Sequence, residues 1–129
     1  MSNQQTLLII LAILIIGATI AVAIAFFNDQ SAASNRDGLT SDLLNFSVRV
    51  HQYYVRPKTW GGGEKSFEGL TMDYITNRPS NAHGSYSILS VAEEQVVIRG
   101  VGISKGNDGN PIMVVMSVFP DSVALSLSN

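Results

Sequence analysis

The chain has 129 residues, 46% of them hydrophobic, and a formal net charge of −2 from eight basic and ten acidic side chains. Lysine and arginine are scattered singly, which excludes the basic stripe that nucleic acid requires, and the absence of cysteine excludes disulfides, thiolate nucleophiles and cysteine-ligated metals. About 100 residues follow the first 28, enough for one small domain.

The first predicted element is an apolar helix, residues 1–28. Between Leu7 and Phe27 only a glycine and a threonine are not apolar, and no side chain before Asp29 is charged. Twenty-one residues of α-helix span roughly 31 Å, which matches the hydrocarbon core of a bilayer. The run is longer than the apolar core of a removable signal and no basic residue precedes it, so we expect it to remain as a membrane anchor.

The composition of this helix favours contact with other helices. Gly17, Ala21 and Ala25 follow one another at four-residue spacing, which makes a face of small residues along which two helix backbones can approach closely. Alanine is also a good helix former and glycine is common in membrane helices, so plain anchoring is the alternative.

Residues 29–56 are predicted to form an amphipathic second half of the same helix. Apolar residues recur there at three- and four-residue spacing, and we expect them to pack on a sheet. The stripe consists of Leu39, Leu43, Phe46, Val50 and Tyr53, with Tyr54 as the alternative to Tyr53. Pro57 should end the helix, and residues 28–38, which include Gly38, are its weakest segment.

Residues 57–129 are predicted to form a loop-rich connector and an antiparallel β head. The glycine run 61–63 indicates a flexible loop in the connector, residues 58–84. Its expected anchors are Trp60, Phe67, Leu70, Met72, Tyr74 and Ile75.

Four runs with the period of β-strands follow the connector. They cover residues 85–91, 95–103, 112–119 and 122–128. The turns between them are short, so neighbouring strands should pair antiparallel. The predicted fold class is therefore α+β, with a long N-terminal helix packed on a small antiparallel sheet of about four strands.

No set of residues in the sequence predicts catalysis, a metal site or a cofactor. His51 and His83 have no metal-ligand or proton-relay partners nearby in the sequence, and no serine shows the nucleophile-elbow pattern. Residues 107–110 lack the acidic spacing of an EF-hand and are better explained as a hairpin turn. The glycosylation sequon at residues 45–47 falls inside the predicted helix, so we discount it. We expect the protein not to be an enzyme and to bind no cofactor.

An uncharged apolar helix that continues into an amphipathic half, a loop and an antiparallel sheet resembles the type IV pilins. The resemblance covers the architecture of the whole chain, while the likeness in sequence pattern is confined to residues 1–55. It implies that the apolar helix half is held in the inner membrane before assembly. These halves then bundle as the core of a filament, and the heads form its outer surface.

The sequence departs from the pilin pattern near its start. Pilin leaders are short, basic and end in glycine, and residues 1–6 contain no such segment. The family commonly has a glutamate at the fifth mature position, where this chain has Gln5 if it is numbered from its mature start. Gln5 can accept a hydrogen bond but cannot form the ion pair attributed to that glutamate. The helix-breaking proline of the apolar half is also absent, with Gly17 in that region.

The resemblance implies that the protein is a structural subunit of an extracellular, type IV pilus-like helical filament at the cell surface. The implied function of the filament is adhesion or motility. The implied partners are other copies of the chain, the inner membrane before assembly and the pilus assembly machinery. The alternative is a single-pass membrane-anchored protein whose small β domain serves as an accessory subunit of a surface complex. Contacts in the filament core are expected at Leu7, Leu11, Leu14, Gly17, Ala18, Ala21, Ala25 and Phe26.

Overall fold

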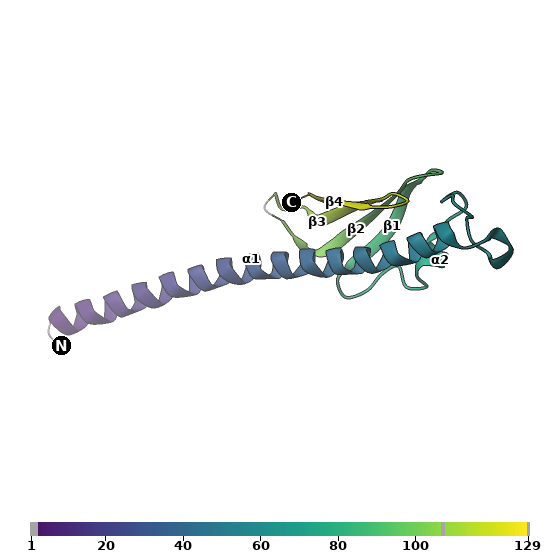
Figure 1. Cartoon of the computed structure of the whole chain (residues 1–129). Coiled ribbons are helices and arrows are strands. Elements are labelled where there is room, and N and C mark those ends of the chain that lie inside the picture. Colours follow the sequence, from purple (N-terminus) through teal and green to yellow (C-terminus); the bar gives the residue numbers. More distant parts are fainter. Residues whose placement is uncertain (1–2, 107, 129) are drawn as a thin grey trace. The chain divides into compact units, whose positions relative to one another are not determined.

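The computed structural model describes residues 3–106 and 108–128. These described residues form one long helix, two short helical segments and four strands, arranged as in Figure 1. In chain order these are α1 Asn3–Val55, η1 Lys58–Trp60, α2 Met72–Ile75, β1 Gly84–Val91, β2 Val96–Lys105, β3 Pro111–Val118 and β4 Val123–Ser128. The predicted α+β class, with one long N-terminal helix and a four-stranded antiparallel sheet, is confirmed.

α1 is uninterrupted from Asn3 to Val55, including residues 28–38, which the sequence indicated as its weakest segment. The chain divides into two compact units, one that ends at Ser31 and one that begins at Ala32. Unit 1 holds the apolar half of α1. Unit 2 holds the amphipathic half, the connector and the sheet.

The chain beyond Pro57 folds back onto the end of α1. Backbone N–H groups of residues 63–65 donate to carbonyl groups near that end at 2.6–3.0 Å, so carbonyls without an intrahelical partner are satisfied. A Cβ atom at Gly63 would lie only 1.8 Å from the backbone oxygen of Ser66. The glycine run, which we expected to be a flexible loop, forms a turn in which Gly62 and Gly63 are needed for space and Gly61 for its positive φ of 82°.

The four strands form a meander in the order β1-β2-β3-β4, and every neighbouring pair is antiparallel. The turn between β1 and β2 is closed by the N–H of Ala92, which donates to the carbonyl of Gln95 at 2.8 Å. Gly109 lies in the turn between β2 and β3 with a φ of 78°, in the left-handed region that favours glycine. The described part of residues 107–110 is therefore a turn, and Asn107 lies outside the described residues.

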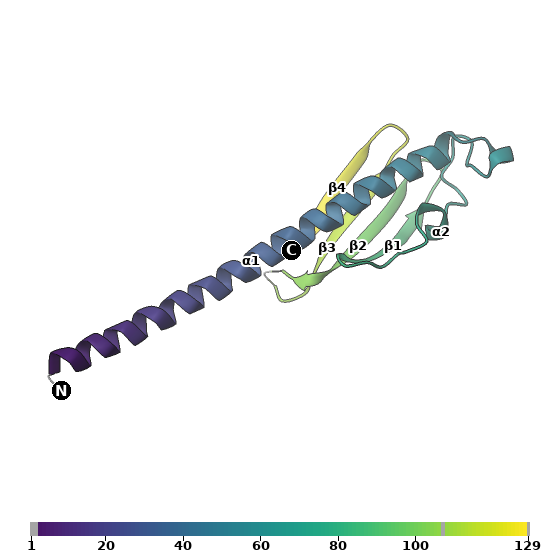
Figure 2. The ribbon, with the colours of Figure 1, turned by 90° about the horizontal axis from the view of Figure 1, so that it is seen from below.

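Within unit 2 the amphipathic half of α1 lies across one face of the sheet (Figures 1 and 2). The five stripe residues are buried, and none is more than 8% exposed: Leu39, Leu43, Phe46, Val50 and Tyr53. Opposite them, alternate residues of β2 and β3 are fully buried, among them Val96, Ile98, Val114 and Met116. The core is thus the layer where the 3.6-residue period of the helix meets the two-residue period of the strands.

Two glycines of β2 allow α1 to approach the sheet closely. A Cβ atom at Gly100 would lie 2.9 Å from the ring of Tyr86 and 3.4 Å from the side chain of Leu39. At Gly102 it would lie 2.0 Å from the side-chain oxygen of Asn35. A larger residue at either position would require the helix or its side chains to move.

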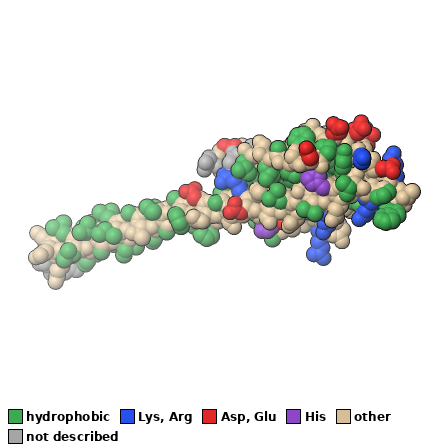
Figure 3. Space-filling model, viewed as in Figure 1, with side chains coloured by type: hydrophobic (Ala, Val, Ile, Leu, Met, Phe, Trp, Pro, Cys, Tyr) green, Lys and Arg blue, Asp and Glu red, His purple; other side chains and the backbone are tan. Residues whose placement is uncertain are grey.

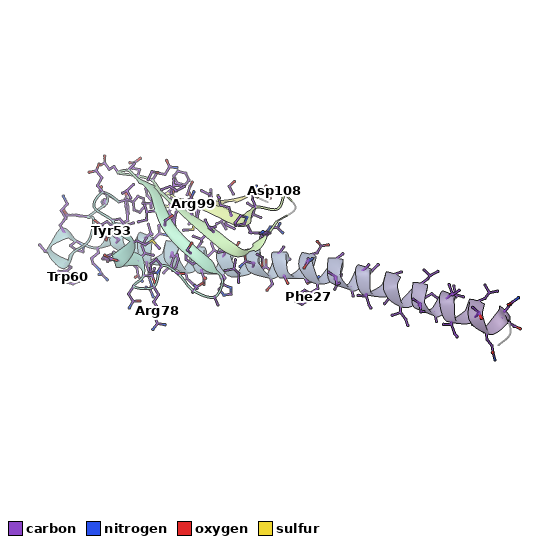
Figure 4. The ribbon with its side chains drawn as sticks, turned by 180° about the vertical axis from the view of Figure 1, so that it is seen from behind. Phe27, Tyr53, Trp60, Arg78, Arg99 and Asp108 are labelled. Atoms are coloured by element: carbon purple, nitrogen blue, oxygen red, sulfur yellow. The ribbon has the colours of Figure 1, made fainter. Side chains whose placement is uncertain are left out.

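The connector closes the core on the β1 side of the sheet. Phe67 and Ile75 are fully buried and Leu70 is nearly so, while Met72 and Tyr74 are half-buried against the same core. Trp60, which we expected to be an anchor, is 76% exposed and points away from the core (Figure 4). That prediction was wrong because Trp60 ends η1 at the tip of the turn, where no other element covers it.

A polar residue that the sequence pattern did not single out joins α1 to the sheet. Asn35 is 6% exposed, and its side-chain amide donates to the backbone oxygen of His83 at 2.6 Å. Its side-chain oxygen accepts from the backbone N–H of Ser104 at 3.2 Å. One side chain therefore connects α1, the loop before β1 and the end of β2.

We predict that Asn35→Ala lowers the free energy of unfolding of unit 2 by about 2 kcal/mol, since the partly buried backbone N–H of Ser104 loses its partner and the backbone oxygen of His83 keeps only the longer bond from Ile103. Denaturant titration of the full chain in detergent micelles measures this change, and amide hydrogen exchange should show faster exchange at Ser104. Ser34→Ala, an exposed substitution next to it on the helix, should stay within about 0.5 kcal/mol of the original protein. Equal stability of the two variants would contradict the proposed role of Asn35.

Candidate self-association surface

No other described segment of unit 1 packs against the apolar half of α1. Each large aliphatic or aromatic side chain from Leu7 to Phe27 is between 50% and 70% exposed. An 18-residue window of this helix has a mean hydropathy of 3.2, and none of it is buried, so by length and composition the helix could cross a membrane. Figure 3 shows hydrophobic side chains all along this unit. This surface requires an apolar environment from outside the unit, either lipid or protein.

Most of the residues expected in a filament core lie on one stripe of the helix. Their spacing alternates between four and three residues, which keeps them on one side of an α-helix. These stripe residues are Leu7, Leu11, Leu14, Ala18, Ala21 and Ala25. Gly17 and Phe26 flank the stripe on its two sides. The small residues fall in the second half of the stripe, where backbones could approach most closely.

Gly17 serves no packing purpose inside its own unit. A Cβ atom built there meets nothing within 4 Å, apart from the backbone of its own helix turn. Glycine in a helix interior costs up to about 1 kcal/mol relative to alanine. Thr19, the other residue of the run that is not apolar, satisfies its hydroxyl internally by donating to the backbone oxygen of Ile15 at 2.8 Å. The helix therefore presents no unsatisfied side-chain hydroxyl there to an apolar environment.

A partly buried polar cluster in unit 2 joins Tyr86 of β1 to Asp42 of α1 and to Asn81. The hydroxyl of Tyr86 donates to the carboxylate of Asp42, and the side-chain amide of Asn81 donates to the same carboxylate oxygen at 2.9 Å. The ring of Tyr86 also packs edge-on against Phe46, with 4.9 Å between ring centroids. Burial, followed by the hydrogen bond and the charge of Asp42, raises the pKa of Tyr86 well above its ordinary value of 10.

This raised pKa predicts a loss of stability in alkali. A tyrosine that ionises later in the folded state contributes full stability below pH 10, and the contribution is lost as the pH rises further. At pH 11 the loss should be about 1 kcal/mol relative to pH 8. Denaturant titration at the two pH values should show a drop that is smaller by this amount in Tyr86→Phe, while Ser85→Ala keeps the full drop. An unchanged drop in Tyr86→Phe would refute the assignment.

Two other side chains that the sequence analysis considered as possible functional sites, those of His51 and Ser47, each contact a backbone oxygen. His51 is half-buried, and its Nε2 atom lies 2.8 Å from the backbone oxygen of Phe119. Ser47 of the sequon is buried within α1, and its hydroxyl donates to the backbone oxygen of Leu44 at 2.6 Å. Among the described residues, no group of three or more His, Asp or Glu side chains is placed to hold a metal ion.

No known protein family, curated protein or solved structure matches this chain. What the molecule does must therefore be inferred from its own surfaces. A long apolar N-terminal helix followed by a small antiparallel sheet is consistent with a pilin-like architecture.

Proposed function

We propose that this protein is the structural subunit of a type IV pilus-like helical filament at the cell surface. In this proposal the apolar half of α1 is inserted in the inner membrane first and lies in the filament core after assembly. The observation that carries the proposal is the 21-residue apolar surface from Leu7 to Phe27, which nothing in unit 1 covers. The pilus assembly machinery would supply the transfer from membrane to filament.

The energetics of covering this helix favour a polymer over a solvated monomer. Apolar surface gains about 25 cal/mol for each Å² removed from water, over a contact area that reaches on the order of a thousand Å². A helix that contacts different faces of its neighbours makes a heterologous contact, and such contacts do not close when the rotation between copies is not a simple fraction of a turn. The result is an open helical filament.

A single-pass membrane anchor is the second candidate, and one observation favours it. The length and hydropathy of the helix fit a bilayer without any protein partner. In this case the β head would bind a partner at the membrane surface as an accessory subunit. In neither proposal does the protein act as an enzyme, and each requires no cofactor.

Substitutions in the face of small residues, Gly17, Ala21 and Ala25, distinguish a filament subunit from a single-pass membrane anchor. We predict that Gly17→Leu and Ala21→Leu abolish filaments or reduce their number severely, because the added side chains keep neighbouring helices apart. Within the subunit Gly17→Leu meets no obstacle, so helix content in detergent should be unchanged or higher. Filament yield is measured by electron microscopy of sheared surface material, and membrane insertion by fractionation.

The matched control is Ala23→Leu, which adds the same volume on the opposite side of the helix from Ala21. It should reduce filament yield less than Ala21→Leu does. If all three variants insert and assemble like the original chain, the small-residue face takes no part in association and the anchor becomes the better proposal.

The proposal itself is tested by negative-stain electron microscopy of material sheared from producing cells. Mass spectrometry of the pelleted fraction identifies the chain and reads its mature N-terminus, which also shows whether Gln5 occupies the position of the pilin glutamate. Uniform thin filaments that contain this chain are the expected result. Recovery of the protein solely in membranes, without filaments, would contradict it.

A further inference from the structure

A groove runs along unit 2 between α1 and the part of the connector that follows α2. The connector is tied to the helix at both ends of this groove. At one end, an Nη atom of Arg49 donates to the backbone oxygen of Ile75 at 2.5 Å. At the other, about two helix turns earlier, the carboxylate of Asp42 accepts from the side-chain amide of Asn81 at 2.9 Å. The connector therefore runs antiparallel to the helix here, and the two hydrogen bonds mark the ends of the groove.

The groove is small and its lining is largely polar. Its volume is about 260 Å³, below the roughly 300–1,000 Å³ of sites for drug-sized ligands, so it fits a smaller molecule. The lining residues of α1 follow a spacing of three and four residues, which places them on one side of the helix. Phe46 is the apolar residue of the lining. What we call the α1–connector groove is defined by the polar side chains along it, which are Asp42, Asn45, Arg49, Thr76, Arg78 and Asn81.

The charged groups at the two ends of the groove are held in place by the fold. One carboxylate oxygen of Asp42 accepts from both the buried Tyr86 and Asn81, and among the described residues none donates to its other oxygen. Arg49 uses one of its five N–H donors on Ile75, which leaves four for a ligand. Side chains that are already positioned lose little conformational entropy when a ligand binds, so this arrangement favours binding.

The middle of the groove offers further hydrogen-bonding groups. Asn45 and Arg78 are exposed, and neither side chain has a hydrogen-bond partner in the part of the chain that the structure describes. Figure 4 shows Arg78 on the connector, at the surface of the unit. The hydroxyl of Thr76 accepts from the backbone N–H of Arg78 at 3.0 Å, which fixes the backbone at that point. Amide and hydroxyl groups can both donate and accept, so several polar groups of one ligand can be bound together.

The charges of the groove select the class of ligand. Arg49 and Arg78 with Asp42 give it a local charge of +1, in a chain whose net charge is −2. A cationic ligand would be repelled by two guanidinium groups, and an apolar ligand would remove the polar lining from water without replacing its hydrogen bonds. A second negative charge on the ligand would be repelled by Asp42 at the other end. The groove therefore favours a singly charged anion that also carries hydroxyl groups.

We propose that the α1–connector groove binds a sugar acid of monosaccharide size, with the carboxylate of the ligand at Arg49 and its hydroxyl groups toward Asp42. The planar guanidinium of Arg49 matches a carboxylate, and the open oxygen of Asp42 accepts from hydroxyl groups. Asn45 and Thr76 bond further hydroxyls, and Phe46 contacts the C–H groups of the sugar ring. This inference goes beyond the proposed function, because the groove belongs to unit 2 and is present in a filament subunit and in an anchored protein alike.

Titration of the isotope-labelled full chain, followed by nuclear magnetic resonance, tests this proposal. The chain is kept in micelles of a polyoxyethylene ether detergent, which presents neither a sugar nor an anion. Glucuronate carries a carboxylate and hydroxyls, glucose only hydroxyls, and acetate only a carboxylate. We expect glucuronate to shift the side-chain amide signals of Asn45 and Asn81 saturably, with a dissociation constant about tenfold or more below those of glucose and acetate. No saturable shift, or equal affinity for either comparison compound, would overturn the proposal.

Charge variants locate the carboxylate of the ligand. Arg49→Gln should weaken glucuronate binding about tenfold, and Arg49→Lys, which keeps the charge, should recover part of the loss. The matched control is Arg99→Gln, which removes the same charge from β2 (Figure 4). Its neighbours Ile98 and Gly100 are buried on the α1 side, so Arg99 belongs to the opposite face of the sheet. Equal losses in Arg49→Gln and Arg99→Gln would show a general effect of charge and reject the groove.

A second variant keeps the test valid if Arg49→Gln, which also loses the bond to Ile75, disturbs the fold. Asn45→Ala breaks no hydrogen bond within the described residues, so the protein should keep its stability while glucuronate binding weakens about threefold. Unchanged affinity in Asn45→Ala and Arg49→Gln would reject the groove as the site. Glucuronate binding without filaments would support the groove and reject the filament, and filaments without glucuronate binding would do the reverse.

Discussion

The need to cover an uncharged apolar helix is the physical constraint on which the rest of this molecule depends. Residues 7–27 cannot remain in water, because so large a contiguous apolar surface is far beyond what soluble monomers expose. A bilayer satisfies this requirement for a single chain, and a bundle of copies satisfies it outside the bilayer. The helix fits both environments because its backbone hydrogen bonds are internal and its one hydroxyl, on Thr19, is bonded within the helix.

The second half of α1 has a different role. It packs on one face of the small sheet and provides one layer of the hydrophobic core. A sheet must bury its apolar face against a second layer, and the stripe from Leu39 to Tyr53 supplies that layer. Gly100 and Gly102 bring the helix close, and Asn35 adds two hydrogen bonds at the start of the packed region. The head is thus built on the same helix that carries the apolar surface.

Periodicity and turn chemistry predicted most of the fold from the sequence. The stripe of α1 and the four strands were predicted because their apolar spacing repeats, and the strand ends because polar turn residues follow them, Glu93 and Glu94 after the first strand and a Gly-, Asn- and Asp-rich run after the second. Tertiary contacts explain what was missed. Asn35 looks like any polar linker residue until β2 and His83 are placed beside it, and Trp60 looks like an anchor until its turn is seen to project from the core.

In the proposed filament, association of the apolar helices depends on packing more than on the hydrophobic effect. Moving the apolar half of α1 from lipid into a helix bundle gains little hydrophobic free energy, because lipid tails are as apolar as leucine side chains. That step depends on close packing at small residues such as Gly17 and Ala21.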